Sequence, residues 1–199
     1  MHPNFAQDAP PTSIMVGGTS YDVKTDYRVW IDVQKELRKI NLRTLDADQM
    51  DENERILEGI EREIFGGVLV DENAIEVLKG IYEFVGGYPS LPVESSGGAP
   101  TFSFEYDLNM IILAIRNQSG IDLSYRRKEP FHWWEFLLEF QSLCGDHYIL
   151  NLMEVRGYKG TDKEMLRQKR IHALPIEYSA EEQAEIDAFE ALFEPKEAN

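Results

Sequence analysis

The residues best suited to chemistry in this chain lie in the stretch EPFHWWEFLLEF, at positions 129–140. His132, Glu135 and Glu139 are spaced i, i+3 and i+7, so a helix would place an imidazole and two carboxylates on one face. Such a cluster is able to bind a metal ion. However, di-iron helical bundles repeat a Glu-x-x-His motif on several helices, whereas here the order is reversed and no partner motif is found. We therefore interpret His132 as a capping or hydrogen-bonded residue and expect no metal and no other cofactor.

A second candidate is Cys144, which with His147 and His132 could form a thiol–imidazole pair or a three-ligand site. The surrounding sequence LCGDHY is typical of one helix that ends at Gly145 and another that begins after Asp146. A thiol in that setting is usually a small packing residue, and no third group that would orient the pair is evident. The sequence also lacks the common hydrolase, phosphate-loop, dinucleotide and zinc-protease motifs. We expect that the protein is not an enzyme.

The two adjacent tryptophans of this stretch point in different directions on a helix, about 100° apart. Trp133 aligns with Phe136 and Phe140 on the expected inward face, and Trp134 aligns with Leu138 on a second face. One interpretation is a helix buried on all sides. The other is that Trp134 and Leu138 contact a protein partner, because large aromatic residues are favoured interface anchors.

The chain has 199 residues, of which 43% are hydrophobic, and this composition is typical of a folded globular protein. Its 36 acidic and 20 basic residues give a net charge of −16, which predicts no binding to nucleic acid or to anionic membranes. We interpret two basic islands, YRRK at 125–128 and RQKR at 167–170, as solvated patches or acid-pairing faces. An acidic protein that imitates DNA stays open as an alternative. A single cysteine, with no apolar run long enough for a membrane span and no signal peptide, favours a reducing cytoplasm.

Residues 1–13 are predicted to be disordered, and residues 14–86 to form a β-hairpin followed by helices. The hairpin SIMVGGTSYDVKT turns at Gly17 and Gly18, because glycine tolerates positive φ. Amphipathic helices are predicted in TDYRVWIDVQKELRKI, DENERILEGIEREIFGG and DENAIEVLKGIYEFVGG. The first is expected to begin with Thr25 as its N-cap. The third is expected to turn these apolar residues toward the core: Ile75, Leu78, Ile81, Tyr82 and Val85.

Proline, glycine and serine dominate residues 87–100, which are predicted to form a loop. Residues 101–178 are expected to be a C-terminal helical region, and residues 179–199 an acidic tail helix with Phe189 and Phe193 on its apolar side. That tail would dock on its own chain or in the groove of a partner. Together these patterns predict a mainly α protein, a multi-helix globular fold with a small N-terminal β-hairpin.

Three stretches resemble the bacteriophage gene product 15 family of siphophage tail modules: YDVKTDYRVWIDVQKEL, FSFEYDLNMIILAIRNQSGIDLSYRRKEPFHWWEFLLEFQSL and LNLMEVRGYKG. The resemblance covers residues 14–178, and its most specific part is the H-W-W-x-F element that follows G-I-D-L. The matching residues are Asp26, Tyr27, Arg28, Trp30, Asp107, Gly120, Ile121, Asp122, Leu123, His132, Trp133, Trp134, Phe136, Met153 and Arg156.

The resemblance implies a non-enzymatic tail assembly chaperone. Members are encoded between the major tail protein and the tape measure protein, where tail assembly chaperones are found. Such a chaperone coats the long helical tape measure protein in the host cell cytoplasm, keeps it soluble and hands it to the tail-tube subunits. The expected partners are the tape measure protein, a second tail assembly chaperone, the major tail protein and a second copy of this chain. The partner-binding residues we predict are Trp134, Leu138, Phe189 and Phe193. The alternatives are an acidic DNA mimic or other phage-encoded inhibitor, and a structural tail component.

Overall fold

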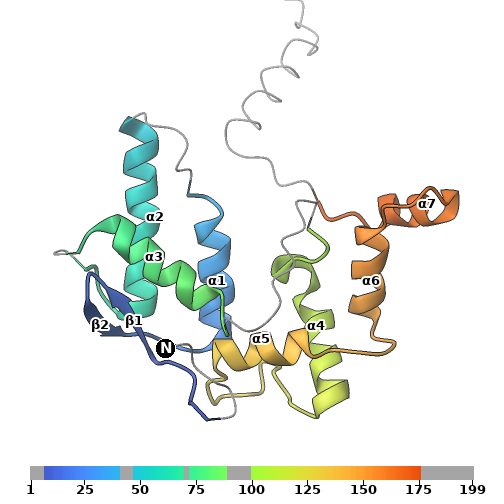
Figure 1. Cartoon of the computed structure of the whole chain (residues 1–199), viewed down its shortest axis with the longest axis horizontal. Coiled ribbons are helices and arrows are strands. Elements are labelled where there is room, and N and C mark those ends of the chain that lie inside the picture. The colour runs from blue at the N-terminus through green and yellow to red at the C-terminus, as the bar shows by residue number, and fades with distance from the viewer. Residues whose placement is uncertain (1–6, 41–46, 70–71, 89–99, 176–199) are drawn as a thin grey trace, which may run out of the picture.

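The computed structural model describes residues 7–40, 47–69, 72–88 and 100–175. These residues form a mainly α fold with a small N-terminal β-hairpin, which confirms the predicted fold class (Figure 1). The tail predicted at 179–199, with Phe189 and Phe193, lies outside the described residues, as does most of the predicted loop. The elements in chain order are β1 (Ser13–Val16), β2 (Thr19–Asp22), α1 (Tyr27–Leu37), α2 (Ala47–Phe65), α3 (Ala74–Val85), α4 (Phe104–Ser119), α5 (Trp133–Gln141), α6 (Tyr148–Gly157) and α7 (Lys163–Ile171).

The hairpin packs on α3 at a position where only glycine fits. β1 and β2 pair antiparallel around Gly17 and Gly18, whose φ angles of 55° and 90° are the positive values that a tight two-residue turn needs. On α3, a Cβ added at Gly80 would lie 2.5 Å from Cγ2 of Ile14 and 2.9 Å from the carbonyl oxygen of Met15. The absence of a side chain at Gly80 therefore lets the helix approach the backbone of β1.

Helix α1 begins one residue later than its sequence suggests. The side chain of Asp26 is the N-cap and accepts a hydrogen bond from the backbone N–H of Arg28 at 3.0 Å. The expected N-cap, Thr25, instead uses its carbonyl oxygen to accept from the N–H of Trp133 at 2.7 Å. Tertiary pairing with the start of α5 therefore decides where the helix begins.

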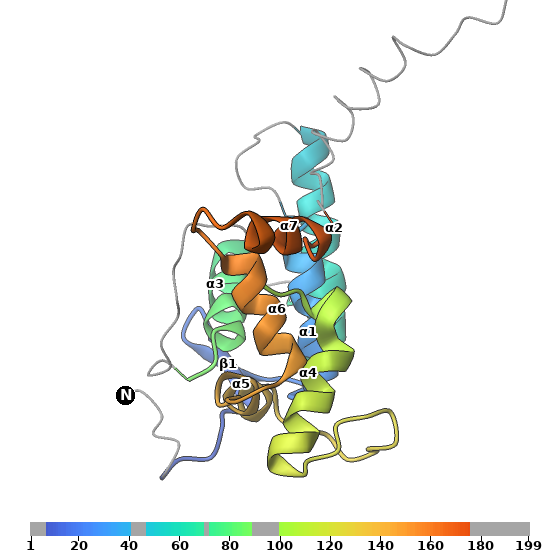
Figure 2. The same cartoon turned by 90° about the vertical axis from the view of Figure 1, so that its right-hand side faces the viewer.

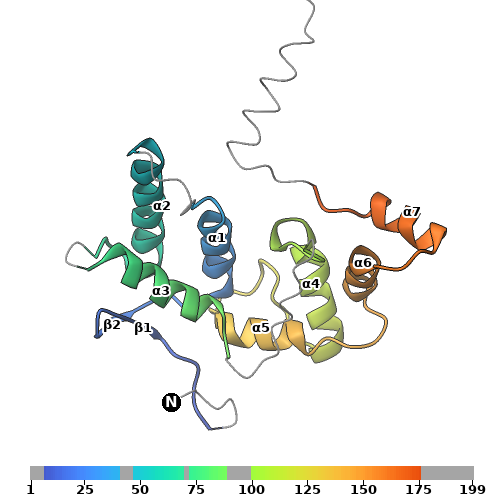
Figure 3. The ribbon, with the colours of Figure 1, turned by 45° about the horizontal axis from the view of Figure 1, so that its top comes forward.

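Helix α5 lies between α1–α3 on one side and α4, α6 and α7 on the other, as Figures 1 and 3 show. Phe136 of α5 stacks on Tyr27 of α1 with ring centroids 4.7 Å apart and also meets Phe104 of α4 at 5.7 Å. Trp133 meets the same Phe104 ring at 5.9 Å. Aromatic side chains of α5 thus join the two halves of the core.

Two of the three stretches that carry the family resemblance meet in space at this junction. The hydroxyl of Tyr27 donates to the carbonyl oxygen of Leu123 at 2.5 Å, and the N–H of Tyr27 donates to the carbonyl oxygen of Phe131 at 2.8 Å. Asp26 and His132 form an antiparallel bridge. Segments about a hundred residues apart in sequence are therefore held together by main-chain hydrogen bonds.

Helix α3 turns a different face to the core than its sequence pattern predicts. Its buried residues are Val77, Gly80, Ile81 and Phe84. Of the predicted inward stripe, Ile81 is buried, Leu78 and Val85 pack partly buried against the core, and Ile75 and Tyr82 are exposed. The contact with β1 through Gly80 sets this rotation, because it places the side without a Cβ against the hairpin.

The C-terminal part of the fold is layered. α6 packs on α4, and α7 packs on α6 and lies across its end in Figure 2. α7, which is described along its whole length, contributes no buried residue. Among the described residues, no helix is both long and apolar enough to cross a bilayer.

Candidate functional site

The two tryptophans of α5 are core residues. Trp133 is fully buried and Trp134 is 6% exposed. Their indole N–H groups donate to two carbonyls in the last turn of α3, Trp133 to Val85 at 3.1 Å and Trp134 to Phe84 at 2.8 Å. Carbonyls in the last turn of a helix have no partner in that helix, and the indole of Trp133 gives the carbonyl of Val85 one. The carbonyl of Phe84 accepts both from the indole of Trp134 and from the N–H of Gly87, at 3.2 Å.

The burial of Trp134 favours the interpretation of a helix buried on more than one side over that of a partner contact at this residue. Its ring meets Tyr88 edge-on at 4.9 Å and Phe84 at 5.8 Å, so little of it is left for another protein. Both the Trp133 side and the Trp134 side of α5 are inward faces, because α3 and the residues after it cover the second one. Leu138, the other predicted contact on this helix, is half-buried.

The polar residues beside the tryptophans have structural contacts. Nδ1 of His132 accepts from the N–H of Trp134 at 3.0 Å and caps α5, while Nε2 lies 2.9 Å from the carbonyl oxygen of Pro11 and donates to it. Burial lowers the pKa of His132, against the opposing effects of the Pro11 hydrogen bond and the charge of Glu135. Glu139 accepts from the hydroxyl of Ser119. These contacts hold the imidazole in the structure as a cap.

The second candidate group, Cys144 with His147 and His132, has these contacts in the structure. Cys144 is exposed, and its N–H donates to Oε1 of Gln118 at 2.9 Å. His147 precedes α6 without forming a side-chain cap. In the described part of the chain, no three His, Cys, Asp or Glu residues are grouped closely enough to hold a metal ion.

An apolar surface is present on the outer side of α3. Ile75 and Tyr82 are 73% and 49% exposed, and Leu78 between them is half-buried. The spacing i, i+3 and i+7 places these three residues on one helix face, which we name the outer stripe of α3 (Ile75, Leu78 and Tyr82). The sequence predicted all three to face the core, and of them Leu78 packs partly buried against it while Ile75 and Tyr82 are exposed. An all-round apolar pattern does not tell which of two faces a helix buries.

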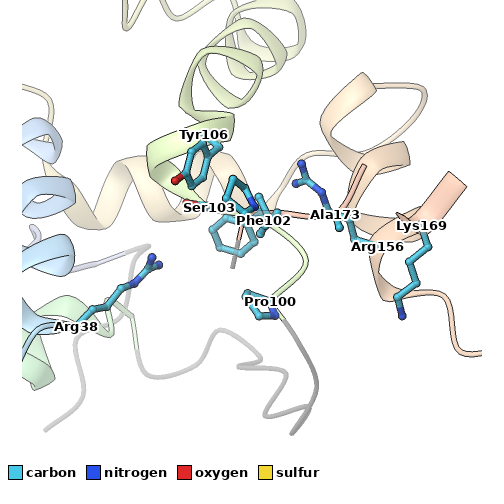
Figure 4. Close-up of a pocket in the computed structure, with 10 residues that line it drawn as sticks. Arg38, Pro100, Phe102, Ser103, Tyr106, Arg156, Lys169 and Ala173 are labelled. Carbon is cyan, nitrogen blue, oxygen red and sulfur yellow. The ribbon is translucent and has the colours of Figure 1, made fainter. Parts of the chain in front are cut away.

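A pocket of about 610 Å³ is lined by residues from the end of α1, the start of α4, α6, α7 and the segment after α7. We name it the cationic pocket and define it by Arg38, Phe102, Tyr106, Arg156, Lys169 and Leu174. Figure 4 shows Arg38 on one side and Arg156 and Lys169 on the other, with Phe102 and Tyr106 between them. None of the described residues that line it is acidic. The chain as a whole has a net charge of −16, whereas the described residues that line this pocket carry only positive charge.

Arg156 and Lys169 are held in the pocket by hydrogen bonds. Arg156 forms an ion pair with the buried Asp107 at 2.6 Å, which holds its guanidinium in place. Nζ of Lys169 donates to the carbonyl oxygen of Tyr158 at 2.8 Å, and this neutral acceptor leaves the positive charge uncompensated. Lys169 belongs to the basic island at 167–170, so the sequence contained a signal for this site. The contribution of Arg38, from the far end of α1, had no such signal.

The described residues thus form a mainly α protein with an aromatic core, an exposed apolar stripe and a cationic pocket. The chain belongs to the bacteriophage Gp15 protein family, whose model matches residues 7–178. This match confirms the resemblance and identifies a bacteriophage protein. Comparison with curated proteins and with solved structures finds no match.

Proposed function

We propose that this chain is a tail assembly chaperone that binds the tape measure protein in the host cell cytoplasm during siphophage tail assembly, without enzymatic activity. Membership of the Gp15 family supports the phage context. The observation that carries the proposal is the outer stripe of α3, where Ile75 is 73% exposed. The further partners we propose are a second tail assembly chaperone and the major tail protein.

The outer stripe of α3 has the shape that a helical partner needs. Apolar residues at i, i+3 and i+7 form a ridge that packs into the groove of another helix. Full burial of an isoleucine or a similar side chain contributes about 1.5–3 kcal/mol. One stripe therefore gives a weak contact, which suits a chaperone that must later release its partner.

A long helical partner would convert this weak contact into a stable complex. When several copies bind along one tape measure protein, each bound copy raises the effective concentration of the binding sites for its neighbours. Self-association between neighbouring copies would strengthen the complex further. The net charge of −16 on each copy would keep such an assembly soluble.

The test is co-expression of the full chain with the tape measure protein of the same phage, scored for soluble complex and for copy number by native mass spectrometry. We expect several copies per tape measure protein. Ile75→Asp and Tyr82→Asp should abolish the soluble complex. Leu113→Asp is the matched control, because Leu113 is an equally apolar residue, 55% exposed, on α4.

Thermal denaturation of each variant separates lost binding from lost folding, and exposed positions should change the melting temperature little. If the tape measure protein stays insoluble with the wild-type chain, chaperone action by this chain alone is wrong. Co-expression with a second tail assembly chaperone would follow, and insolubility there as well would overturn the proposal. If Leu113→Asp abolished the complex as fully as Ile75→Asp, the stripe would not be the binding surface.

A further inference from the structure

We propose that the cationic pocket is the docking site of the chain's own acidic C-terminal segment, residues 179–199. The inference rests on the pocket and on the composition of that segment, and it holds whether or not the proposed function does. The occupant is part of the same molecule, bound in cis.

Charge complementarity is the first argument. Residues 179–199 hold seven acidic residues and one lysine, a net charge of −6. The pocket presents Arg38 and Lys169 from opposite sides, and none of its described lining residues is acidic. A segment this acidic is repelled by a surface that is itself strongly negative, and a pocket with cations and no acidic residue among its described lining relieves that repulsion.

Apolar complementarity is the second argument. Between the cations the pocket offers aromatic surface, with Tyr106 45% exposed and Phe102 half-buried beside it. In the acidic segment, Ile186, Phe189 and Phe193 are spaced i, i+3 and i+7, and a helix would place them on one face. Glutamates flank that face in the sequence. One helix would therefore present both apolar side chains to the aromatic surface of the pocket and carboxylates to its cations.

The connection of the chain is the third argument. Pro175 lines the pocket, and Glu181 follows it by only six residues, a span of at most about 20 Å when extended. A link this short gives an effective concentration on the order of mM, so even a weak site would be mostly occupied in cis. The family model ends at residue 178, so the pocket lies in the matched part of the chain and the acidic segment lies beyond it.

Hydrogen–deuterium exchange of the full chain, read by mass spectrometry, tests this docking. We expect the amides of residues 181–194 to exchange more slowly than the same sequence in a free peptide. Charge reversal at the two cations, Arg38→Glu with Lys169→Glu, should speed this exchange about tenfold, while amides of α4 and α5 keep their protection. High salt should act in the same direction, because it screens the attraction.

The matched control is Lys79→Glu on α3 with Lys163→Glu on α7. It changes the net charge of the protein by the same amount as the variant of the two pocket cations but alters no residue that lines the pocket. It should leave the exchange of residues 181–194 unchanged. Phe193→Ala should weaken the protection without altering the pocket.

Three outcomes would overturn the proposal. One is a wild-type segment that exchanges as fast as the free peptide. Another is an equal loss of protection in the control variant, which would make the effect one of overall charge. The third is protection that disappears on about a hundredfold dilution, because it would show that a second copy supplies the segment.

Discussion

The guanidinium of Arg156 and the carboxylate of Asp107 form a two-point ion pair, with N···O distances of 2.6 and 3.2 Å. The two side chains are only 10% and 1% exposed. Asp107 also accepts from the N–H of Ser103 at 2.9 Å, and Arg156 also donates to the carbonyl oxygen of His172 at 2.7 Å. The pair therefore ties the first turn of α4 to the end of α6 and to the segment after α7. Both residues belong to the pattern that resembles the Gp15 family, and their pairing gives that pattern a physical reason.

Removal of either partner should destabilise the fold strongly. Asp107→Ala or Arg156→Ala leaves the other charge buried without its counterion, which typically costs about 3–5 kcal/mol. We expect a loss of this size in the free energy of unfolding, measured by urea denaturation with the slope unchanged.

The exposed pair of Lys35 and Glu105 serves as the control, because its two side chains are 53% and 38% exposed. Lys35→Ala should cost less than about 1 kcal/mol. The double variant Asp107→Leu with Arg156→Met should be less destabilised than either single change, since no unpaired charge remains. An Asp107→Ala chain as stable as Lys35→Ala would contradict the role of the buried pair.

Truncation of Trp134 should also unfold the protein more easily. Trp134→Ala removes a buried indole together with its hydrogen bond to the carbonyl oxygen of Phe84, and such changes typically cost about 3–5 kcal/mol. Tyr125→Ala is the control, since Tyr125 is 86% exposed and should change the melting temperature little. An unchanged melting temperature for Trp134→Ala would restore the hypothesis that this residue is reserved for a partner.

The sequence pattern predicts the elements of this fold better than their contacts. The apolar period locates the helices, and the double glycine locates the hairpin turn, because both signals are local. The N-cap of α1 was misplaced by one residue, because the carbonyl of Thr25 pairs with Trp133, more than a hundred residues away. No local pattern contains that information.

The candidate sites were less predictable for the same reason. α3 is apolar on more than one side, so its sequence does not tell that Gly80 faces the hairpin and Ile75 faces solvent. The cationic pocket needs Arg38 and Lys169, which come from opposite ends of the chain. Only the basic island around Lys169 was visible in advance.

Two glycines in helices should respond to alanine in opposite directions. Gly59 of α2 has no atom within 4 Å of an added Cβ, so Gly59→Ala should stabilise the protein by roughly 0.5–1 kcal/mol through helix propensity. Gly80→Ala gains the same propensity but places its Cβ 2.5 Å from Ile14 and 2.9 Å from the carbonyl oxygen of Met15. The carbonyl oxygen of Met15 belongs to the backbone of β1 and cannot rotate away, so α3 would have to move away from β1 to relieve the steric clash.

We therefore expect Gly80→Ala to lower the melting temperature and Gly59→Ala to raise it. Differential scanning calorimetry of the two single variants would measure both shifts under the same conditions. A stabilised Gly80→Ala chain would mean that α3 does not approach the hairpin as closely as the structure has it.

His132 should make stability depend on pH near neutrality. Burial holds its pKa below the ordinary value of 6.5, with the Pro11 carbonyl and the charge of Glu135 acting in the opposite direction. Nδ1 accepts from the N–H of Trp134, so a proton on that nitrogen would break the cap of α5. The folded chain thus binds this proton less readily than the unfolded chain does.

The stabilising effect of a neutral His132 is fully present above about pH 6.5 and is lost as the pH falls from there toward the lowered pKa. The free energy of unfolding should decrease between about pH 7.5 and pH 5.5, by at most about 1.4 kcal/mol per pH unit for this one group. His132→Asn is the matched variant, because asparagine is a good N-cap that does not titrate. Urea denaturation across this range should give a flatter profile for His132→Asn than for the wild-type chain. Parallel profiles would assign the pH dependence to other groups and leave His132 as a cap with no titration linked to folding.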